Sequence, residues 1–400
     1  MEICPHFGIC GGCTLQDKPY QEQLASKKEH VLKLLAPYYG GNIEIIPSPE
    51  TEFFRNKIEL SFTRQAVWKD PSGKKKKIIR DKSKPVELEN AVGFRLKGRW
   101  DRCIDLKSCL LFNPKLAQFV AEVRQWASKR GLSYYDQRTH EGILRNMLLR
   151  EGKNTGEGMI VLVTAAALDL TDFAELTQKI YPGWSVLSAI NASLSDASPY
   201  TNLKVLKGGS VIKEVISAGP LKVTLELYPQ SFFQTNTHAA NLMYNAVRKK
   251  IEILKPQIMY DLYGGAGSFS LCCSDLVGKS LCVENVAPAV VNGQQNAKIN
   301  NASNIEFYCE KTEDFLNGRK IEARKAVIIL DPPRMGLHPL ACKAVLKSGV
   351  KNVLYISCNP VTLADNLRIL SQNYAVKEVS CFDFFPHSSH VETFAVLELK

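Results

Sequence analysis

Residues 258–267 read Ile-Met-Tyr-Asp-Leu-Tyr-Gly-Gly-Ala-Gly, an apolar strand that runs directly into a glycine-rich turn. An apolar helical stretch follows, and strand and helix patterns then alternate to the last residue. Alternation at this spacing is typical of a doubly wound parallel α/β domain. We therefore predict such a domain over residues 219–400, with a sheet of about seven strands. The predicted strands lie near residues 259–262, 280–283, 305–308, 326–330, 353–356, 376–382 and 394–398.

The glycine turn, which includes Gly265, indicates a cofactor site. Glycines let the backbone approach a ligand closely, and twenty residues beyond Gly264 the next strand ends in Glu284. Its carboxylate can accept hydrogen bonds from both ribose hydroxyls of an adenosyl ligand. The alternative is a tight strand-to-helix turn beside a surface carboxylate. Because the turn does not match G-x-G-x-x-G and no P-loop lysine follows, S-adenosylmethionine is favoured over NAD and ATP.

Polar motifs near the ends of later strands predict a catalytic site at the carboxyl edge of the sheet, where open α/β folds bind ligands. Asp331 begins Asp-Pro-Pro-Arg, Cys358 lies in Ser-Cys-Asn-Pro, and Glu392 follows two histidines, His387 and His390. A free cysteine is more often a small buried hydrophobe, but a turn at the end of a strand exposes the Cys358 thiol. For the two histidines, surface or supporting roles are expected as much as catalytic ones.

A thiol nucleophile and a carboxylate base are what methylation of a pyrimidine at C5 requires. Uracil C5 is too weakly nucleophilic to attack a methyl sulfonium, so a thiolate must first add at C6. After methyl transfer, a base removes the C5 proton and the thiolate leaves by elimination. The residue types therefore predict Cys358 as the nucleophile and Glu392 as the base.

The net charge of +11 is concentrated in residues 51–150, which hold 23 basic and 11 acidic residues. Such a local excess favours a nucleic-acid partner. We predict an α+β domain on antiparallel strands over residues 16–218, with a helix over 21–35 that packs either within it or on the C-terminal domain. RNA contacts are predicted from the run Lys74 to Lys77 and from residues 54–57 and 145–150, the alternative being a solvated charged face.

The N-terminal loop, residues 1–15, contains Cys4, Cys10 and Cys13 among three glycines. Thiolates at this density indicate a shared metal centre, whose fourth ligand must come from Cys103 or Cys109. Zinc and an iron–sulfur cluster both accept four thiolates, so the residues alone leave the choice open.

The chain resembles, over essentially its whole length, the bacterial RNA uracil-5 methyltransferases. Five motifs match in order and spacing: Phe232-Phe-Gln-Thr-Asn236, the Asp261 turn, Asp331-Pro-Pro-Arg334, Ser357-Cys-Asn-Pro360 and His390-Val-Glu392. The resemblance implies a class I methyltransferase fold in which Cys358 is the nucleophile and Glu392 the proton acceptor. It implies that S-adenosylmethionine contacts Gln234, Tyr263, Glu284 and Asp331. It also implies a [4Fe-4S] cluster, structural or RNA-positioning in role, on Cys4, Cys10, Cys13 and Cys109.

The resemblance is strongest to the shorter enzymes that methylate 23S ribosomal RNA, since the chain begins at the cysteine cluster without the β-barrel RNA-binding module of some members. Methylation of a 23S uridine is therefore the expected function. The alternatives are 5-methyluridine formation in the tRNA T-loop, an RNA cytosine-5 methyltransferase and a non-catalytic iron–sulfur RNA-binding protein. No apolar stretch approaches the roughly 20 residues of a membrane span, and no signal peptide is evident. A cytoplasmic monomer is expected.

Overall fold

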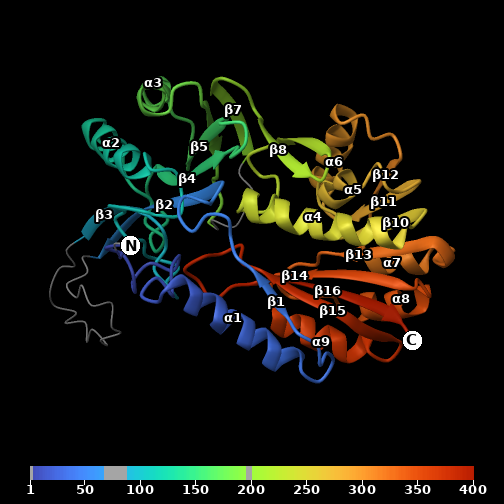
Figure 1. The fold of residues 1–400 in the computed structure, drawn as a ribbon. Coiled ribbons are helices and arrows are strands. Elements are labelled where there is room, and N and C mark those ends of the chain that lie inside the picture. Colours follow the sequence, from blue (N-terminus) through green and yellow to red (C-terminus); the bar gives the residue numbers. More distant parts are fainter. Residues whose placement is uncertain (1–2, 67–87, 195–200) are drawn as a thin grey trace. The chain divides into compact units, whose positions relative to one another are not determined.

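The computed structural model describes residues 3–66, 88–194 and 201–400, which divide into two compact units (Figure 1). Unit 1 comprises Met1–Asp17 and Glu52–Ile212, and unit 2 comprises Lys18–Thr51 and Lys213–Lys400. Residues 18–51 thus belong with the C-terminal part of the chain, whereas the predicted central domain started at residue 16. The run Lys74 to Lys77 lies outside the described residues.

Unit 2 is built on an eight-stranded sheet in the order β1-β15-β16-β14-β13-β10-β11-β12. All neighbours are parallel except β16, which is antiparallel to both β14 and β15. The strands are β1 (Glu44–Ile46), β10 (Ile258–Leu262), β11 (Lys279–Glu284), β12 (Ile305–Cys309), β13 (Ala326–Leu330), β14 (Asn352–Ser357), β15 (Tyr374–Phe382) and β16 (Glu392–Leu399). The seven predicted strands are all present, and β1 adds an eighth by pairing with the edge of β15.

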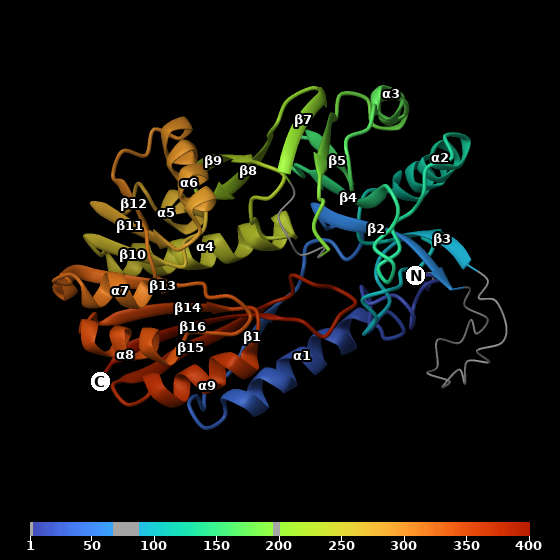
Figure 2. The same ribbon diagram turned by 180° about the vertical axis from the view of Figure 1, so that it is seen from behind.

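Helices cover both faces of this sheet (Figures 1 and 2). One face carries α1 (Tyr20–Leu35), α7 (Thr312–Asn317), α8 (Pro339–Ser348) and α9 (Pro360–Leu370), whose apolar residues share a core with the strands. The other carries α4 (Thr237–Leu254), α5 (Ser268–Cys272) and α6 (Ala287–Ile299). Burial on both faces explains why central strands such as β13, Ala-Val-Ile-Ile-Leu, are wholly apolar. The two-stranded sheet of β8 (Ile212–Ala218) and β9 (Leu221–Leu227) packs on α6.

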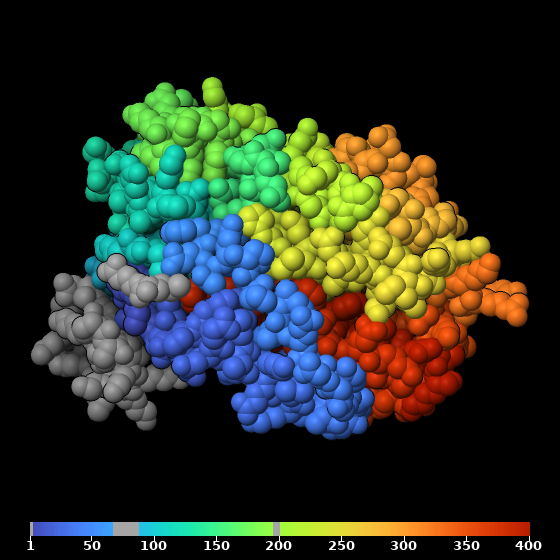
Figure 3. All heavy atoms as spheres, viewed as in Figure 1, coloured from blue at the N-terminus to red at the C-terminus, as the bar shows by residue number. Residues whose placement is uncertain are grey.

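Helix α1 is joined to unit 2 by its buried face. Val31 and Leu35 lie in the core of the large sheet, and the helix packs beside α9. In the space-filling view, the blue of residues 18–51 adjoins the red of the C-terminal strands (Figure 3). The prediction of a helix over 21–35 is correct, and the structure selects the C-terminal packing partner.

Unit 1 holds a six-stranded sheet in the order β3-β2-β4-β5-β6-β7. The strands are β2 (Lys57–Ala66), β3 (Leu88–Gly93), β4 (Leu144–Glu151), β5 (Gly158–Thr164), β6 (Ser185–Ile190) and β7 (Thr201–Lys207). Helices α2 (Leu116–Lys129) and α3 (Thr171–Ile180) pack against each other and share the core of the sheet. The expected antiparallel pairing is wrong for β5 and β6, which are parallel because α3 connects them as a crossover. None of the helices in the described part of the chain combines the length and the apolar character that a membrane span requires.

Candidate active site and cysteine cavity

The glycine turn after β10 has a left-handed backbone, which residues other than glycine adopt only rarely. Tyr263, Gly265 and Gly267 have φ angles of 62°, 54° and 78°, in the left-handed region that glycine enters without penalty. A Cβ on Gly264 would lie 2.4 Å from the sulfur of Cys282, so that position has no room for a side chain. The turn therefore presents bare backbone at the carboxyl end of β10, beside the point where the strand order reverses between β10 and β13.

Two carboxylates hold this turn in shape. Asp261 is fully buried and accepts hydrogen bonds from the backbone N–H and hydroxyl of Ser270, at 3.0 and 2.6 Å. Glu284, at the end of β11, accepts from the N–H of Gly265 at 3.1 Å and from that of Val286 at 2.9 Å. The predicted cofactor acid thus lies directly against the glycine turn.

The strand on the other side of the switch point adds a third carboxylate. Asp331 follows β13, and the amide of Gln234 donates to it at 3.5 Å. Burial, and then the charge of Asp261, raise the pKa of Asp331 to about 7, against the hydrogen bond from Gln234. Gln234 precedes α4, whose N-cap Asn236 accepts from the N–H of Ala239 at 3.1 Å. The structure thus gathers Gln234, Asp331 and the glycine turn at one sheet edge.

Cys358 and Glu392 lie at the ends of adjacent strands. Ser357, the last residue of β14, pairs with Thr393 of β16 in antiparallel register. Cys358, which follows Ser357, and Glu392, which precedes Thr393, therefore lie at the same edge of the sheet. Asn359 caps α9 and Pro360 starts it, which places Cys358 in the turn between strand and helix. The thiol is partly exposed, as predicted, whereas Glu392 is only 2% exposed.

The electrostatics couple these groups. Burial, and then Glu392 and Asp331, raise the pKa of Cys358 to about 12, while Arg334 opposes the shift. Burial, and then Asp331, raise the pKa of Glu392 to about 8, again against Arg334. Each carboxylate disfavours the charge of its neighbours, so a bound cation would favour ionisation of both carboxyls and the thiol. The guanidinium of Arg334 donates to Nδ1 of His390 at 3.1 Å.

Helix α1 anchors the segment that leads into Glu392, a feature that sequence reasoning missed. The ammonium of Lys27 lies 2.6 Å from the carboxylate of Asp383 and donates to the carbonyl of Phe385 at 3.0 Å, with both charged side chains buried. Gln23 accepts from the N–H of His387 at 2.8 Å. His387, at a φ of 65°, is itself buried and its Nε2 lies 3.0 Å from the carbonyl of Thr51.

We call residues 383–391 the β15–β16 loop. Hydrogen bonds from His387 to Gln23 of α1 and to Thr51, in the segment after α1, fix the conformation of this loop. His387 therefore supports the loop. His390 instead contacts Arg334. Glu392 has one carboxylate oxygen, Oε2, that is buried without a hydrogen-bond partner. An unpaired oxygen of this kind is costly in a folded protein, and it is available to a substrate proton.

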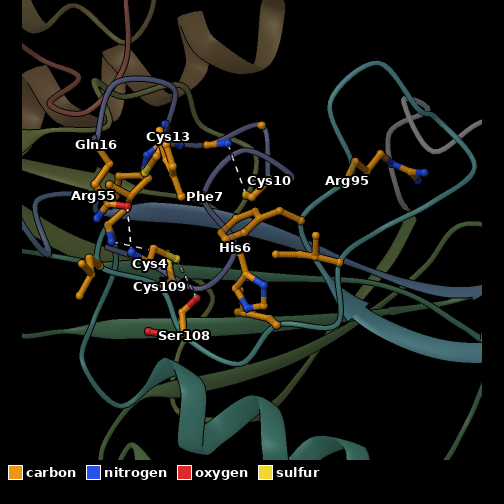
Figure 4. Close-up of a pocket in the computed structure, with 17 residues that line it drawn as sticks. Cys4, His6, Phe7, Cys10, Cys13, Gln16, Arg55, Arg95, Ser108 and Cys109 are labelled. Carbon is orange, nitrogen blue, oxygen red and sulfur yellow. Dashed lines mark hydrogen bonds between the residues drawn. The ribbon is translucent and has the colours of Figure 1, made fainter. Parts of the chain in front are cut away.

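The four predicted cluster cysteines line one cavity of about 250 Å³ in unit 1 (Figure 4). Cys4, Cys10 and Cys13 come from the N-terminal loop and Cys109 from the segment before α2. Burial raises the pKa of Cys13 to about 12 and that of Cys109 to about 11, and neighbouring cysteines add to both shifts. Arg55 lines the same cavity, where the cysteines favour its positive charge against burial.

Two observations describe what this cavity could hold. Among the described residues, no group of three or more His, Cys, Asp or Glu side chains is arranged to hold a metal ion, so the structure does not support the predicted metal centre. Cys103, the other candidate for the fourth ligand, is buried elsewhere, with its sulfur 3.4 Å from the carbonyls of Ser61 and Ala91.

The two described segments predicted to contact RNA differ in burial: residues 145–150 are interior, whereas Arg55 and Lys57 of the segment 54–57 are partly exposed. Arg145 and Arg150 of β4 are each 1% exposed, and the Arg145 guanidinium lies 4.1 Å from the ring centre of Tyr135 and donates to the carbonyl of Asn191 at 2.7 Å. Phe54 is also buried. The prediction of phosphate contacts from residues 145–150 is wrong, because carbonyls and an aromatic face inside unit 1 take the place of phosphate.

Comparison with known proteins identifies relatives along the whole chain. The family described as tRNA (uracil-5-)-methyltransferase matches residues 200–400. The chain is 34% identical to the tRNA (uracil(54)-C(5))-methyltransferase of Pyrococcus furiosus, over 97% of this chain and 83% of that protein. It is 33% identical to a Clostridium tetani protein described as an uncharacterized RNA methyltransferase, over 99% of this chain and 84% of that protein.

A solved structure is similar over both units. The tRNA (uracil-54, C5)-methyltransferase of Pyrococcus abyssi, in complex with S-adenosyl-L-homocysteine, matches with a TM-score of 0.73 and 27% identity. The match covers 98% of this chain and 86% of that one.

Proposed function

Because the chain belongs to the RNA uracil-5 methyltransferase family, an S-adenosylmethionine-dependent group, we propose that it methylates C5 of a uridine through covalent catalysis by Cys358 and Glu392. The observation that carries the proposal is the register of β14 and β16, which brings the thiol and the buried carboxyl to one sheet edge beside Asp331. The raised pKa values of Asp331 and Glu392 mark an environment that favours a bound cation. The cofactor's sulfonium is such a cation, and it supplies the methyl group.

Each residue then has a defined task. The Cys358 thiolate forms a bond to C6 of the uracil, which makes C5 nucleophilic enough to accept the methyl group. Glu392 removes the proton from C5 with its unpaired oxygen, and the electrons released expel the thiolate from C6. Arg334 lies where its charge favours both the thiolate and the carboxylate. Gln234, Tyr263, Gly265, Glu284 and Asp331 are proposed to hold the cofactor.

We further propose that Cys4, Cys10, Cys13 and Cys109 hold a [4Fe-4S] cluster. Support comes from the common cavity that all four cysteines line and from the motif resemblance. Arg55 beside them would offset the negative charge of such a cluster. The chemistry above moves no electron, so the group's proposed task is to join the N-terminal loop to the segment around Cys109.

Two RNA classes are candidates for the substrate. The named relatives act on uracil 54 of tRNA, which supports tRNA. The motif resemblance to the shorter ribosomal enzymes supports 23S ribosomal RNA. Both substrates present a uridine that must leave its stack to reach the thiol.

The proposal is tested by offering the purified enzyme tRNA and 23S transcripts with S-adenosylmethionine and mapping 5-methyluridine by mass spectrometry. We expect one RNA class to be methylated at defined uridines, and Cys358→Ala to bind that RNA without forming product. Methylation by Cys358→Ala at the wild-type rate, or methylation of cytosine in place of uracil, would overturn the proposal.

A further inference from the structure

Trp100 is the most unusual surface residue of unit 1. Its side chain is 64% exposed, whereas the other two tryptophans that the structure describes, Trp126 and Trp184, are 6% and 7% exposed. Tryptophan is highly buried on average because its ring is large and apolar. An indole held in solvent therefore points to a binding partner that covers it.

The segment that carries it is a closed turn, here called the Trp100 loop and defined as residues 94–103. Arg95 and Cys103 face each other in an antiparallel bridge, and the N–H of Leu96 donates to the carbonyl of Arg102 at 3.0 Å. Gly98, with a φ of 71°, allows the tight reversal at the tip. Arg95 also donates to the carbonyl of Trp100. The backbone that presents the indole is thus fixed at both sides.

The base of the loop rests on the cysteine cavity. Leu96, which is buried, forms an antiparallel bridge with Cys10, and Arg95 lines the cavity wall with its guanidinium directed away from the cysteines (Figure 4). Order in the N-terminal loop therefore supports the position of the Trp100 loop.

The surface around the indole is cationic. Arg99 donates to both oxygens of Asp101, at 2.9 and 3.0 Å, and Arg138 donates to one of them at 3.1 Å. One buried carboxylate thus fixes two guanidinium groups, whose side chains remain 42% and 47% exposed. Lys97 is exposed at the tip. The three cations outnumber the one carboxylate, so the net charge of this surface is positive. Two of the cations, Arg99 and Arg138, are held in place before any ligand binds.

We propose that the Trp100 loop is an RNA-contacting surface, in which the indole stacks on an unpaired base and Lys97, Arg99 and Arg138 contact the flanking phosphates. This inference rests on the proposed function, since it takes the partner to be the RNA substrate. Aromatic stacking beside fixed cations is how proteins bind single-stranded segments of RNA. RNA supplies both a base that can stack on the indole and phosphates that can pair with the cations. A protein partner would need an aromatic or apolar group surrounded by acidic side chains.

The test compares Trp100→Ala with Trp100→Phe, which keeps an aromatic face. We expect Trp100→Ala to weaken RNA binding roughly tenfold, as loss of one stacked base does, and Trp100→Phe to bind almost as well as wild type. With saturating RNA, kcat of Trp100→Ala should be unchanged, because stacking here contributes to binding in ground and transition state alike. Leu203→Ala, which removes another exposed apolar side chain of unit 1, is the control and should have no effect.

A second measurement examines the cations. Lys97→Ala with Arg99→Ala should lower the slope of log affinity against log salt by about 0.7 to 0.9 for each lost phosphate contact. Asp101 keeps Arg138 as its partner in that variant. Unchanged affinity of Trp100→Ala for the RNA would overturn the inference. It would also be overturned if Trp100→Ala still bound RNA but no longer bound a protein partner of the wild-type enzyme. Because RNA binding is measured separately from methylation, an inactive wild-type enzyme would contradict the proposed function, whereas the affinity of Trp100→Ala for RNA would still decide this inference.

Discussion

At the scale of single residues, Glu392 determines how the proposed reaction ends. It is the buried carboxyl next to the nucleophile, and its unpaired oxygen is free to accept a proton. Thiolate addition and methyl transfer do not need this base, whereas elimination does. The two halves of the reaction should therefore be separable by mutation at this one position.

Glu392→Gln should stall the enzyme after methyl transfer, with the methylated RNA still bonded to Cys358. Denaturing gel electrophoresis would reveal a protein–RNA adduct that requires S-adenosylmethionine. The Cys358→Ala, Glu392→Gln double variant is the matched control and should form none. Release of methylated RNA from Glu392→Gln at the wild-type rate would remove Glu392 from the mechanism.

The raised pKa of Glu392 predicts a pH dependence of the ligand-free protein. The carboxyl ionises at about 8 in the folded chain and near 4.3 when unfolded, as free glutamate does. The unfolded state therefore releases this proton first, so the group reduces the free energy of unfolding progressively as pH rises from about 4.3 to about 8. Glu392→Gln should raise Tm relative to wild type at pH 8.5 and change it little at pH 4. An equal shift at both pH values would contradict the assigned environment.

At the scale of elements, α1 is expected to act on catalysis through the β15–β16 loop. Lys27→Met removes one partner of a buried ion pair and leaves Asp383 unpaired, which typically costs about 3–5 kcal/mol in the free energy of unfolding. Below the unfolding temperature, we expect slower elimination, seen as accumulation of the RNA adduct in single-turnover reactions. A purely structural role for Lys27 would lower Tm without accumulating the adduct.

Two variants control this experiment. Lys33→Met lies on the same helix, where Lys33 and Glu29 form an exposed pair, and should change stability by less than about 1 kcal/mol. Adding Asp383→Asn to Lys27→Met removes the unpaired charge while keeping an acceptor for the N–H of Phe385, to which Asp383 is bonded at 3.1 Å. That double variant should recover part of the lost Tm.

At the scale of the whole molecule, the cysteine cavity joins two distant segments of unit 1. Protein purified without oxygen should contain about four iron atoms per chain if the cavity holds a four-cysteine cubane cluster. Cys109→Ser should lose the iron, whereas Cys103→Ser should retain it because that sulfur contacts backbone carbonyls elsewhere. Stoichiometric zinc without iron would show that the proposed metal is wrong.

Local sequence patterns were enough to predict the architecture of the C-terminal unit and the positions of its motifs. Strand β10, the glycine turn and the strand-end positions of Asp331 and Cys358 follow from local patterns: apolar runs, glycines and prolines act within a few residues. The same locality explains why helix α1 was predicted almost to the residue.

Which charges are buried and which segments meet could be learned only from the three-dimensional structure. The arginines of β4 were predicted to lie on a basic surface, but both are buried, and Arg145 packs against Tyr135. Likewise, nothing near Lys27 in sequence reveals Asp383, and nothing near Trp100 reveals that its ring faces solvent while Trp126 is enclosed. Burial and charge pairing depend on contacts between residues far apart in the chain, which local patterns do not encode.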